Sequence, residues 1–230
     1  MENNFGEQTL ESMNQASWYN AWTLNKFKIF LKGKILEVGC GIGNFTKILS
    51  SYGEISAIDI HKQYLPQVRK KTPDAQVGLG NIEEGKYFFK NKKFNSIVCI
   101  NVQEHIEHAE AALNNMSKLL LDGGILILLV PSYPFLYGEI DKAISHFRRY
   151  AKKDLITKIE AEDFKIIEFK KLNFIGAIGW FVSGRILKNK IVDSSKIKIF
   201  NLIAPLFLKF VYFIPIPFGT SFLIIAKKNK

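Results

Sequence analysis

The chain has 230 residues, of which 47% are apolar and 23% charged, a composition typical of a soluble globular protein with one sizeable core. Its two cysteines, Cys40 and Cys99, lie in apolar runs, which excludes a disulfide framework and a paired-cysteine zinc site. The polar, acidic residues 1–10 exclude a secretory signal peptide, so we expect a cytoplasmic protein.

The positive charge is concentrated near the C-terminus. The net charge is +11, and residues 185–230 contribute +8, with nine lysines and arginines against Asp193 alone. Basic residues interleaved with apolar ones indicate an acidic partner, which can be an anionic membrane surface, a phosphorylated substrate or nucleic acid. A solvated basic face is the alternative interpretation.

Short apolar runs alternate with helical patterns up to residue 130. An amphipathic helix is predicted over 17–31, with Trp18, Trp22 and Ile29 on one side. Strand and helix then alternate with short connections, which predicts a parallel sheet covered on both faces. The predicted strands are 34–38, 55–60, 75–79, 95–100 and 124–130, and the helices between them are 45–50, 61–71 and 109–121.

The pattern is less regular after residue 130. A long loop rich in Tyr, Gly and Pro is expected over 131–150, and loops of that length are often functional. A helix over 152–162, a strand over 164–172 and a last strand over 219–227 follow. We expect a single domain over 1–230, with an N-terminal helical cap over 1–33 and an apolar, basic, partly helical insertion over 173–217.

A glycine-rich loop joins the first predicted strand to the next helix. Residues 37–43 read Glu-Val-Gly-Cys-Gly-Ile-Gly, and glycines there let the backbone turn sharply and approach a ligand. Dinucleotide enzymes use G-x-G-x-x-G, whereas Gly43 comes one residue early. Glu37 would repel a pyrophosphate but attract the ammonium and sulfonium groups of S-adenosylmethionine (SAM). The loop therefore favours SAM over a dinucleotide.

Asp59 ends the second predicted strand, twenty residues after Gly39. A carboxylate at that place can accept hydrogen bonds from both hydroxyls of a ribose. Together with Glu37, Gly41 and Gly43, it makes a strong nucleotide-binding pattern.

These motifs resemble those of the class I SAM-dependent methyltransferases, and the resemblance runs from Leu24 to about Lys171, with a final strand at the C-terminus. It implies a Rossmann-like α/β sandwich, with a seven-stranded, mostly parallel sheet whose last strand is antiparallel. The cofactor residues that it implies are Glu37, Gly39, Gly41, Gly43, Asp59, Ile60, Asn81, Ile82 and Asn101. Asn81 stands where the family more often has Asp, and its amide oxygen can still accept a hydrogen bond from the adenine amino group.

Ligands of open α/β sheets bind beyond the carboxyl ends of the strands. His105 follows the fourth strand and is a candidate general base, needed when the acceptor loses a proton. His146 lies in the later loop and is a second catalytic candidate. No metal is expected, and His105 can equally have a structural or cofactor-side role.

The segment 137–150 (YGEIDKAISHFRRY) resembles a subgroup of bacterial methyltransferases that modify sugars and polyketides. We expect Tyr137, Arg148, Arg149 and Tyr150 to bind the acceptor, since paired arginines can clamp a phosphate or carboxylate. In the alternative, one arginine pairs with Glu139 or Asp141 and fixes the loop.

An apolar stripe is predicted within the insertion, over 199–217. It is short for a membrane span and contains Pro205, Lys209 and Pro215. Packing on the core, a lid over the acceptor, contact with a membrane interface and dimerisation remain open.

The expected function is methyl transfer, to oxygen or nitrogen, on a small-molecule, sugar or lipid-linked acceptor. A non-catalytic SAM-binding protein is the alternative. A nucleic-acid methylase is disfavoured, because 101–104 reads Asn-Val-Gln-Glu where base-methylating enzymes carry Asn/Asp-Pro-Pro-aromatic and an aromatic platform for a flipped base.

Overall fold

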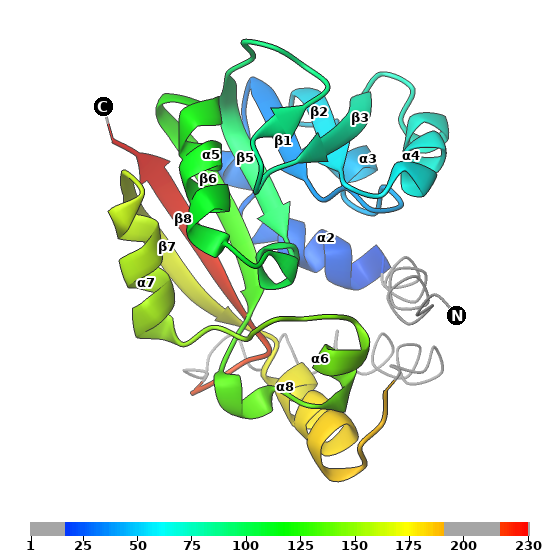
Figure 1. Ribbon diagram of the computed structural model, residues 1–230, viewed down its shortest axis with the longest axis vertical. Coiled ribbons are helices and arrows are strands. Elements are labelled where there is room, and N and C mark those ends of the chain that lie inside the picture. Colours follow the sequence, from blue (N-terminus) through cyan, green and yellow to red (C-terminus); the bar gives the residue numbers. More distant parts are fainter. Residues whose placement is uncertain (1–16, 191–216, 230) are drawn as a thin grey trace.

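The computed structural model describes residues 17–190 and 217–229. They form an α/β sandwich around one eight-stranded sheet with the strand order β4-β3-β2-β1-β5-β6-β8-β7 (Figure 1). The strands are β1 (Lys34–Val38), β2 (Glu54–Asp59), β3 (Gln76–Asn81), β4 (Lys86–Tyr87), β5 (Phe94–Ile100), β6 (Leu120–Pro131), β7 (Phe164–Leu172) and β8 (Ser221–Lys228).

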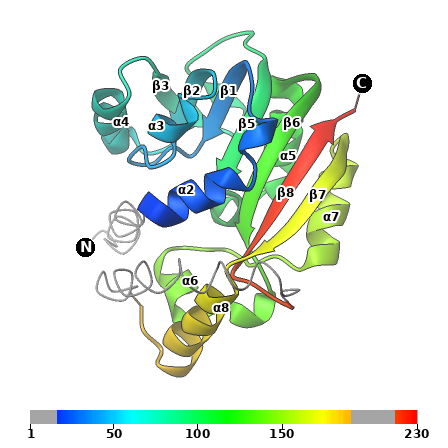
Figure 2. The ribbon, with the colours of Figure 1, turned by 180° about the vertical axis from the view of Figure 1, so that it is seen from behind.

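The described helices lie on both faces of this sheet and at one end of it. They are α2 (Ser17–Asn25), α3 (Thr46–Leu49), α4 (Leu65–Lys71), α5 (Ala109–Leu119), α6 (Glu139–Ala143), α7 (Lys152–Ala161) and α8 (Phe174–Trp180), and a π-helix over Phe181–Ile186 continues α8. Figure 1 shows α5 and α7 in front of the sheet, and Figure 2 shows α2 crossing the opposite face. Both views place α6 and α8 together beyond the end of β6.

Alternate residues of each strand pack against opposite layers, as the pleat of a strand requires. In β1, Leu36 joins the core formed with α5 and α7, and Ile35 joins the core formed with α2 and α3. Both side chains are fully buried. Because the central strands are covered on both faces, most of their residues are apolar, with exceptions such as the buried Glu37 in β1, and these apolar runs made the strands recognisable in the sequence.

The predicted parallel sheet with an antiparallel last strand is confirmed, since β1, β2, β3, β5 and β6 pair in parallel and β8 runs antiparallel to β6 and β7. The predicted number of seven strands is wrong, because the short β4 pairs antiparallel with β3. Asn81 causes this turn: its side-chain oxygen accepts hydrogen bonds from the backbone N–H groups of Glu83 and Glu84, which sends the chain back along β3. β4 has only two residues, so it is too short to show the alternation of apolar and polar residues by which a strand is predicted.

The helix predicted over 17–31 is also partly wrong. It ends at Asn25 and is followed by a 3-10 turn over Lys28–Phe30. The change of helical period turns Ile29 outward, with 78% of its surface exposed, and buries Phe27 instead. The rest of the N-terminal cap, 1–16, lies outside the described residues.

The insertion between the last two strands begins as a helix, α8, directly after β7. The stripe predicted over 199–217 lies almost entirely outside the described residues. The segment expected as a loop over 131–150 contains α6 and a 3-10 turn at Pro134–Leu136. Within 17–190 and 217–229, the structure has no helix of the length and apolar character that a membrane span requires.

Candidate active site

The glycine loop between β1 and α3 is anchored on the neighbouring strand. The backbone N–H groups of Gly39 and Cys40 donate hydrogen bonds to the carbonyl of Ile58 in β2. Gly39, like Gly41 and Gly43, has a positive φ, here +73°. A Cβ on Gly39 would lie 2.2 Å from a methyl carbon of Val102, so only glycine fits at this crossing.

Glu37 lies buried behind the loop, with 5% of its surface exposed. Its Oε2 accepts a hydrogen bond of 2.5 Å from the Thr46 hydroxyl at the start of α3. Burial raises the pKa of Glu37 to about 8, the Thr46 bond opposes that shift, and the nearby Asp59 adds to it. In the free protein the Glu37 carboxyl therefore holds its proton at neutral pH, and a cationic ligand would favour its ionisation.

Asp59 connects the loop with the chain beyond β2. Its Oδ2 accepts the N–H of Gly41 at 2.7 Å, and its Oδ1 accepts the N–H of His61 at 2.8 Å. Each carboxylate oxygen has a second lone pair, so these bonds leave Asp59 able to accept further hydrogen bonds. Two carboxyl groups thus lie beside the glycine loop, an arrangement suited to a cationic ligand.

The residues expected around an adenine lie next to Asp59. A hollow beside β3 and β4 is lined by Ile60, Asn81 and Phe88, among others. Ile60 is 59% exposed, whereas Ile82 is buried in the core. The side-chain oxygen of Asn81 is engaged by its own turn, and its amide donates to Glu84 Oε1 at 2.8 Å. The adenine contact expected from the Asn81 oxygen would therefore have to share that oxygen with the turn.

The chain after β5 forms the next part of the site. Asn101 has φ +53°, and the 3-10 turn Gln103–His105 follows it. The segment before α7 is bound to this turn, because the N–H of Phe147 donates to the carbonyl of Glu104 at 2.8 Å and the hydroxyl of Tyr150 donates to the carbonyl of Gln103 at 3.0 Å. Two loops that lie far apart in the sequence thus form one surface next to Val102 and the glycine loop.

Asp141 in α6 organises this surface. Its Oδ1 accepts hydrogen bonds from His146 Nδ1 at 2.9 Å and Arg149 Nε at 2.8 Å. Its Oδ2 accepts from the backbone N–H of Gly138 and from the indole of Trp180, both at 3.0 Å. Although burial would raise the pKa of Asp141, the His146 hydrogen bond and the Arg149 charge outweigh it and lower the pKa. Asp141 is therefore a buried, fully hydrogen-bonded carboxylate.

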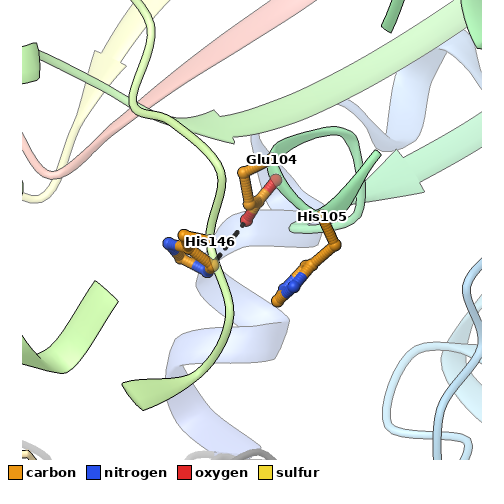
Figure 3. A group of neighbouring side chains, drawn as sticks. All are labelled: Glu104, His105 and His146. Carbon is orange, nitrogen blue, oxygen red and sulfur yellow. Dashed lines mark ion pairs between the residues drawn. The ribbon is translucent and has the colours of Figure 1, made fainter. Parts of the chain in front are cut away.

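His105, His146 and Glu104 converge at this surface (Figure 3). Glu104 Oε1 lies 3.7 Å from His146 Nε2, and the two imidazole rings meet edge to face with centroids 4.7 Å apart. Burial raises the pKa of Glu104 to about 7. Burial of the ring, followed by the neighbouring His146, lowers the pKa of His105 to about 4, although part of the residue stays exposed. His105 is therefore uncharged at neutral pH.

The four residues expected to bind the acceptor have different surroundings. Arg149 is buried, paired with Asp141 and 4.8 Å from the ring centre of Trp180, which supports the alternative in which it fixes the loop. Tyr150 is buried in the core. The half-buried Tyr137 donates to the carbonyl of His146 at 2.8 Å. Arg148 is partly exposed and donates to the carbonyl of Glu107 at 2.9 Å.

Sequence reasoning missed Trp180 and Val102 as parts of the site. Trp180 lies in the apolar insertion, where the sequence pattern predicts only that an aromatic residue packs against the core. No local sequence signal predicts its hydrogen bond to Asp141. Val102 follows β5 directly, and only the crossing with Gly39 reveals its role.

Residues 36–128 of the 230-residue chain match a protein-family model described as a methyltransferase domain. An uncharacterised protein of Methanocaldococcus jannaschii is 27% identical, over 74% of this chain and 71% of its own length. A ubiquinone biosynthesis O-methyltransferase of Coxiella burnetii is 26% identical, over 43% of this chain. The match spans 44% of that enzyme, less than half of its length.

Solved structures share the fold at low sequence identity. A SAM-dependent methyltransferase from Clostridium acetobutylicum superposes with a TM-score of 0.61 at 13% identity, covering 94% of this chain and 92% of that one. The N-methyltransferase NodS of Bradyrhizobium japonicum, in complex with S-adenosyl-L-homocysteine, gives a TM-score of 0.57 at 15% identity, over 94% of this chain and 86% of NodS.

Proposed function

From the match of residues 36–128 to a methyltransferase domain, we propose that the chain is a SAM-dependent enzyme that transfers a methyl group to oxygen or nitrogen of a small-molecule, sugar or lipid-linked acceptor. The observation that carries the proposal is the adjacency of two surfaces. Val102, in contact with Gly39 of the glycine loop, is the neighbour in sequence of the turn that bears Glu104 and His105.

The residues of the glycine loop fit the cofactor. SAM supplies an electrophilic methyl group on a sulfonium centre, next to an ammonium group. We assign the methionine end to Glu37 and to the loop at Gly39, Gly41 and Gly43, because a carboxyl group suits an ammonium group and glycines let a ligand approach the backbone closely. Asp59 is assigned to the ribose. We assign the binding of the adenine and the adjoining part of the cofactor pocket to the remaining residues, which are Ile60, Asn81, Ile82 and Asn101.

The acceptor is assigned to the surface formed by the turn after β5 and the segment before α7. Methyl transfer is an in-line displacement, so the protein has to hold the accepting atom close to the methyl carbon. Arg148, the partly exposed arginine of the pair, is placed to bind an anionic group, and Tyr137 borders the same segment. His105 and His146 lie beside the accepting atom, and the uncharged His105 ring has a nitrogen lone pair available.

The beginning of the insertion supports an acceptor attached to a lipid. Ile178, Phe181, Ile186 and Leu187 are exposed on α8 and the helix that continues it. The charged residues of that stretch are the basic Arg185, Lys188 and Lys190. An apolar surface with basic residues suits the interface of an anionic membrane, where a lipid-linked acceptor would be presented.

The test is a methyl-transfer assay on the purified chain. Labelled SAM is incubated with a panel of acceptors, comprising free phenols, amines, nucleotide sugars and lipid-linked sugar phosphates in anionic or neutral vesicles. We expect transfer to an anionic acceptor, with an increased KM in Arg148→Ala. Binding of S-adenosylhomocysteine without transfer to any member of the panel would favour a non-catalytic SAM-binding protein. Transfer to nucleic acid alone would contradict the proposed acceptor class.

A further inference from the structure

Glu104 has an arrangement that the methyl-transfer chemistry leaves unexplained. Its side chain is fully buried, yet neither carboxylate oxygen accepts a hydrogen bond from any residue in the described part of the chain. A buried carboxylate without partners costs free energy, so buried carboxylates are normally hydrogen-bonded, paired or bound to metal. The group that faces it is the ring nitrogen Nε2 of His146, 3.7 Å from Oε1.

The neighbouring Asp141 determines which nitrogen of His146 carries the proton. Asp141 forms an ion pair with Arg149 and so acts as an acceptor, which places the proton of the 2.9 Å hydrogen bond on Nδ1 of His146. In the neutral ring, Nε2 then presents its lone pair to the lone pairs of Glu104. A cation between them would stabilise these two facing acceptors, and their separation of 3.7 Å is longer than a hydrogen bond with a shared proton.

His105 completes the group from the exposed side. The ligand atoms of Glu104, His105 and His146 all lie within 4.8 Å of one another (Figure 3). Two ligand atoms at about 2.0 Å from a tetrahedral ion lie about 3.3 Å apart, so the Glu104–His146 separation of 3.7 Å is close to this, and the wider separations need side-chain shifts of up to about 1.5 Å. The side chains come from two loops held together by the hydrogen bond from Phe147 to Glu104.

We propose that Glu104, His105 and His146 bind a divalent transition-metal ion, with Asp141 as the outer partner that orients His146. A carboxylate that holds the N–H of a metal-bound histidine is a common feature of such sites. Two nitrogen ligands and one oxygen ligand favour zinc-type ions over magnesium or calcium. Three protein ligands leave a coordination position open, on the side where His105 is exposed.

The open coordination position adds a role for the metal ion in the proposed methyl transfer. This part of the inference rests on the proposed function. An oxygen of the acceptor that binds the ion would lose its proton more readily and would be held beside the cofactor loop. The site predicts an acceptor with an ionisable hydroxyl or carboxyl group at the methylated position. The metal site itself stands on the geometry of the three side chains alone.

The test uses the untagged full-length chain, freed of metal by a chelator and titrated with Zn²⁺ by calorimetry, without SAM or acceptor. We expect one ion per chain, confirmed by elemental analysis, and much weaker binding of Mg²⁺. Glu104→Gln and His146→Gln should lose at least tenfold in affinity, and Asp141→Asn should lose about 10–100-fold through His146. The matched control is His108→Gln, a histidine outside the group at the start of α5.

A second measurement uses the wild-type chain, so that the metal site can be tested even if the variants fail to fold. With ring-labelled histidine, nuclear magnetic resonance should show zinc-dependent shifts at His105 and His146, while His61 and His108 keep their positions. Shifts at His61 or His108 instead, or the absence of a stoichiometric zinc isotherm, would overturn the metal site. Calorimetry of S-adenosylhomocysteine on the zinc-free chain separates the two proposals, because cofactor binding without zinc binding contradicts only the metal, and zinc binding without cofactor binding contradicts only the proposed function.

Discussion

The indole nitrogen of Trp180 donates a hydrogen bond of 3.0 Å to Oδ2 of Asp141, thirty-nine residues away. The same ring lies 4.8 Å from the guanidinium carbon of Arg149, the ion-pair partner of Asp141. Through this bond the first helix of the insertion, α8, is attached to the loop that carries His146. The insertion is therefore part of the structure that positions the acceptor side of the site.

Removing the indole hydrogen bond should loosen the loop. In Trp180→Phe an aromatic ring remains next to Arg149, but Asp141 loses one donor to its carboxylate. We expect the free energy of unfolding to fall by about 1.5–3 kcal/mol, the range for hydrogen bonds to charged groups. Urea denaturation measures it, with the exposed Ile178→Ala on the same helix as a control expected to change little. Equal values for both variants would show that the bond does not hold the loop.

Gly39 and Gly179 form a matched pair for testing the cofactor loop. An alanine at Gly39 would place its Cβ 2.2 Å from Val102 and would have to adopt φ +73°, whereas no atom of residues 17–190 and 217–229 lies within 4 Å of a Cβ at Gly179. We expect Gly39→Ala to lose about 1–2 kcal/mol from the backbone conformation, with an added cost from the clash, and to abolish binding of S-adenosylhomocysteine. Gly179→Ala, in α8, should be stabilised by about 0.5–1 kcal/mol and bind normally. Calorimetry and thermal melts check both, and normal binding by Gly39→Ala would contradict the assigned loop.

The raised pKa of Glu37 makes the stability of the free protein depend on pH. The carboxyl titrates at about 8 in the folded chain and near 4.5 when unfolded, so between these values the folded state holds a proton that the unfolded state releases. The contribution of Glu37 to stability is therefore present at low pH and is lost as pH rises through this window.

Glu37→Gln removes the titration while its amide oxygen can still accept the Thr46 bond. The melting temperature of the variant minus that of the wild type should therefore increase from pH 5 to 8 and level off above it. Saturating S-adenosylhomocysteine, whose ammonium favours the ionised carboxylate, should stabilise the wild type more than the variant. A difference that stays constant with pH would contradict the raised pKa.

The adjacent arginines should behave differently. Arg149 is buried with Asp141, so Arg149→Met removes half of a buried ion pair, and we expect unfolding to become easier by about 3–5 kcal/mol. Arg148 makes a partly exposed bond to the carbonyl of Glu107, and Arg148→Met should cost less than about 1 kcal/mol. In steady-state kinetics on an anionic acceptor, Arg148→Met should increase the KM. Its melting temperature should stay nearly unchanged. A large loss of stability in Arg148→Met would reverse these assignments.

Much of the fold could be predicted because its signals are local. Strand residues that are buried on both faces, such as those over 125–131 of β6, are mostly apolar, and the glycines after β1 mark a turn that few other residues can adopt. The two-residue β4 could not be predicted, because it exists through pairing with β3 and not through its own pattern. The outward position of Ile29 also depended on a local change of helical period.

The sequence by itself determined the parallel sheet and the glycine loop with Glu37, Gly39 and Asp59, since each rests on patterns along short stretches of the chain, whereas the antiparallel last strand was expected from the family resemblance. Only the tertiary structure decided which of the adjacent arginines is buried, and that Glu104 faces His146 with no hydrogen-bond partner for its carboxylate in the described part of the chain. Those relationships join segments separated by many residues, and their energy depends on distance and desolvation in the folded chain, which no local pattern encodes.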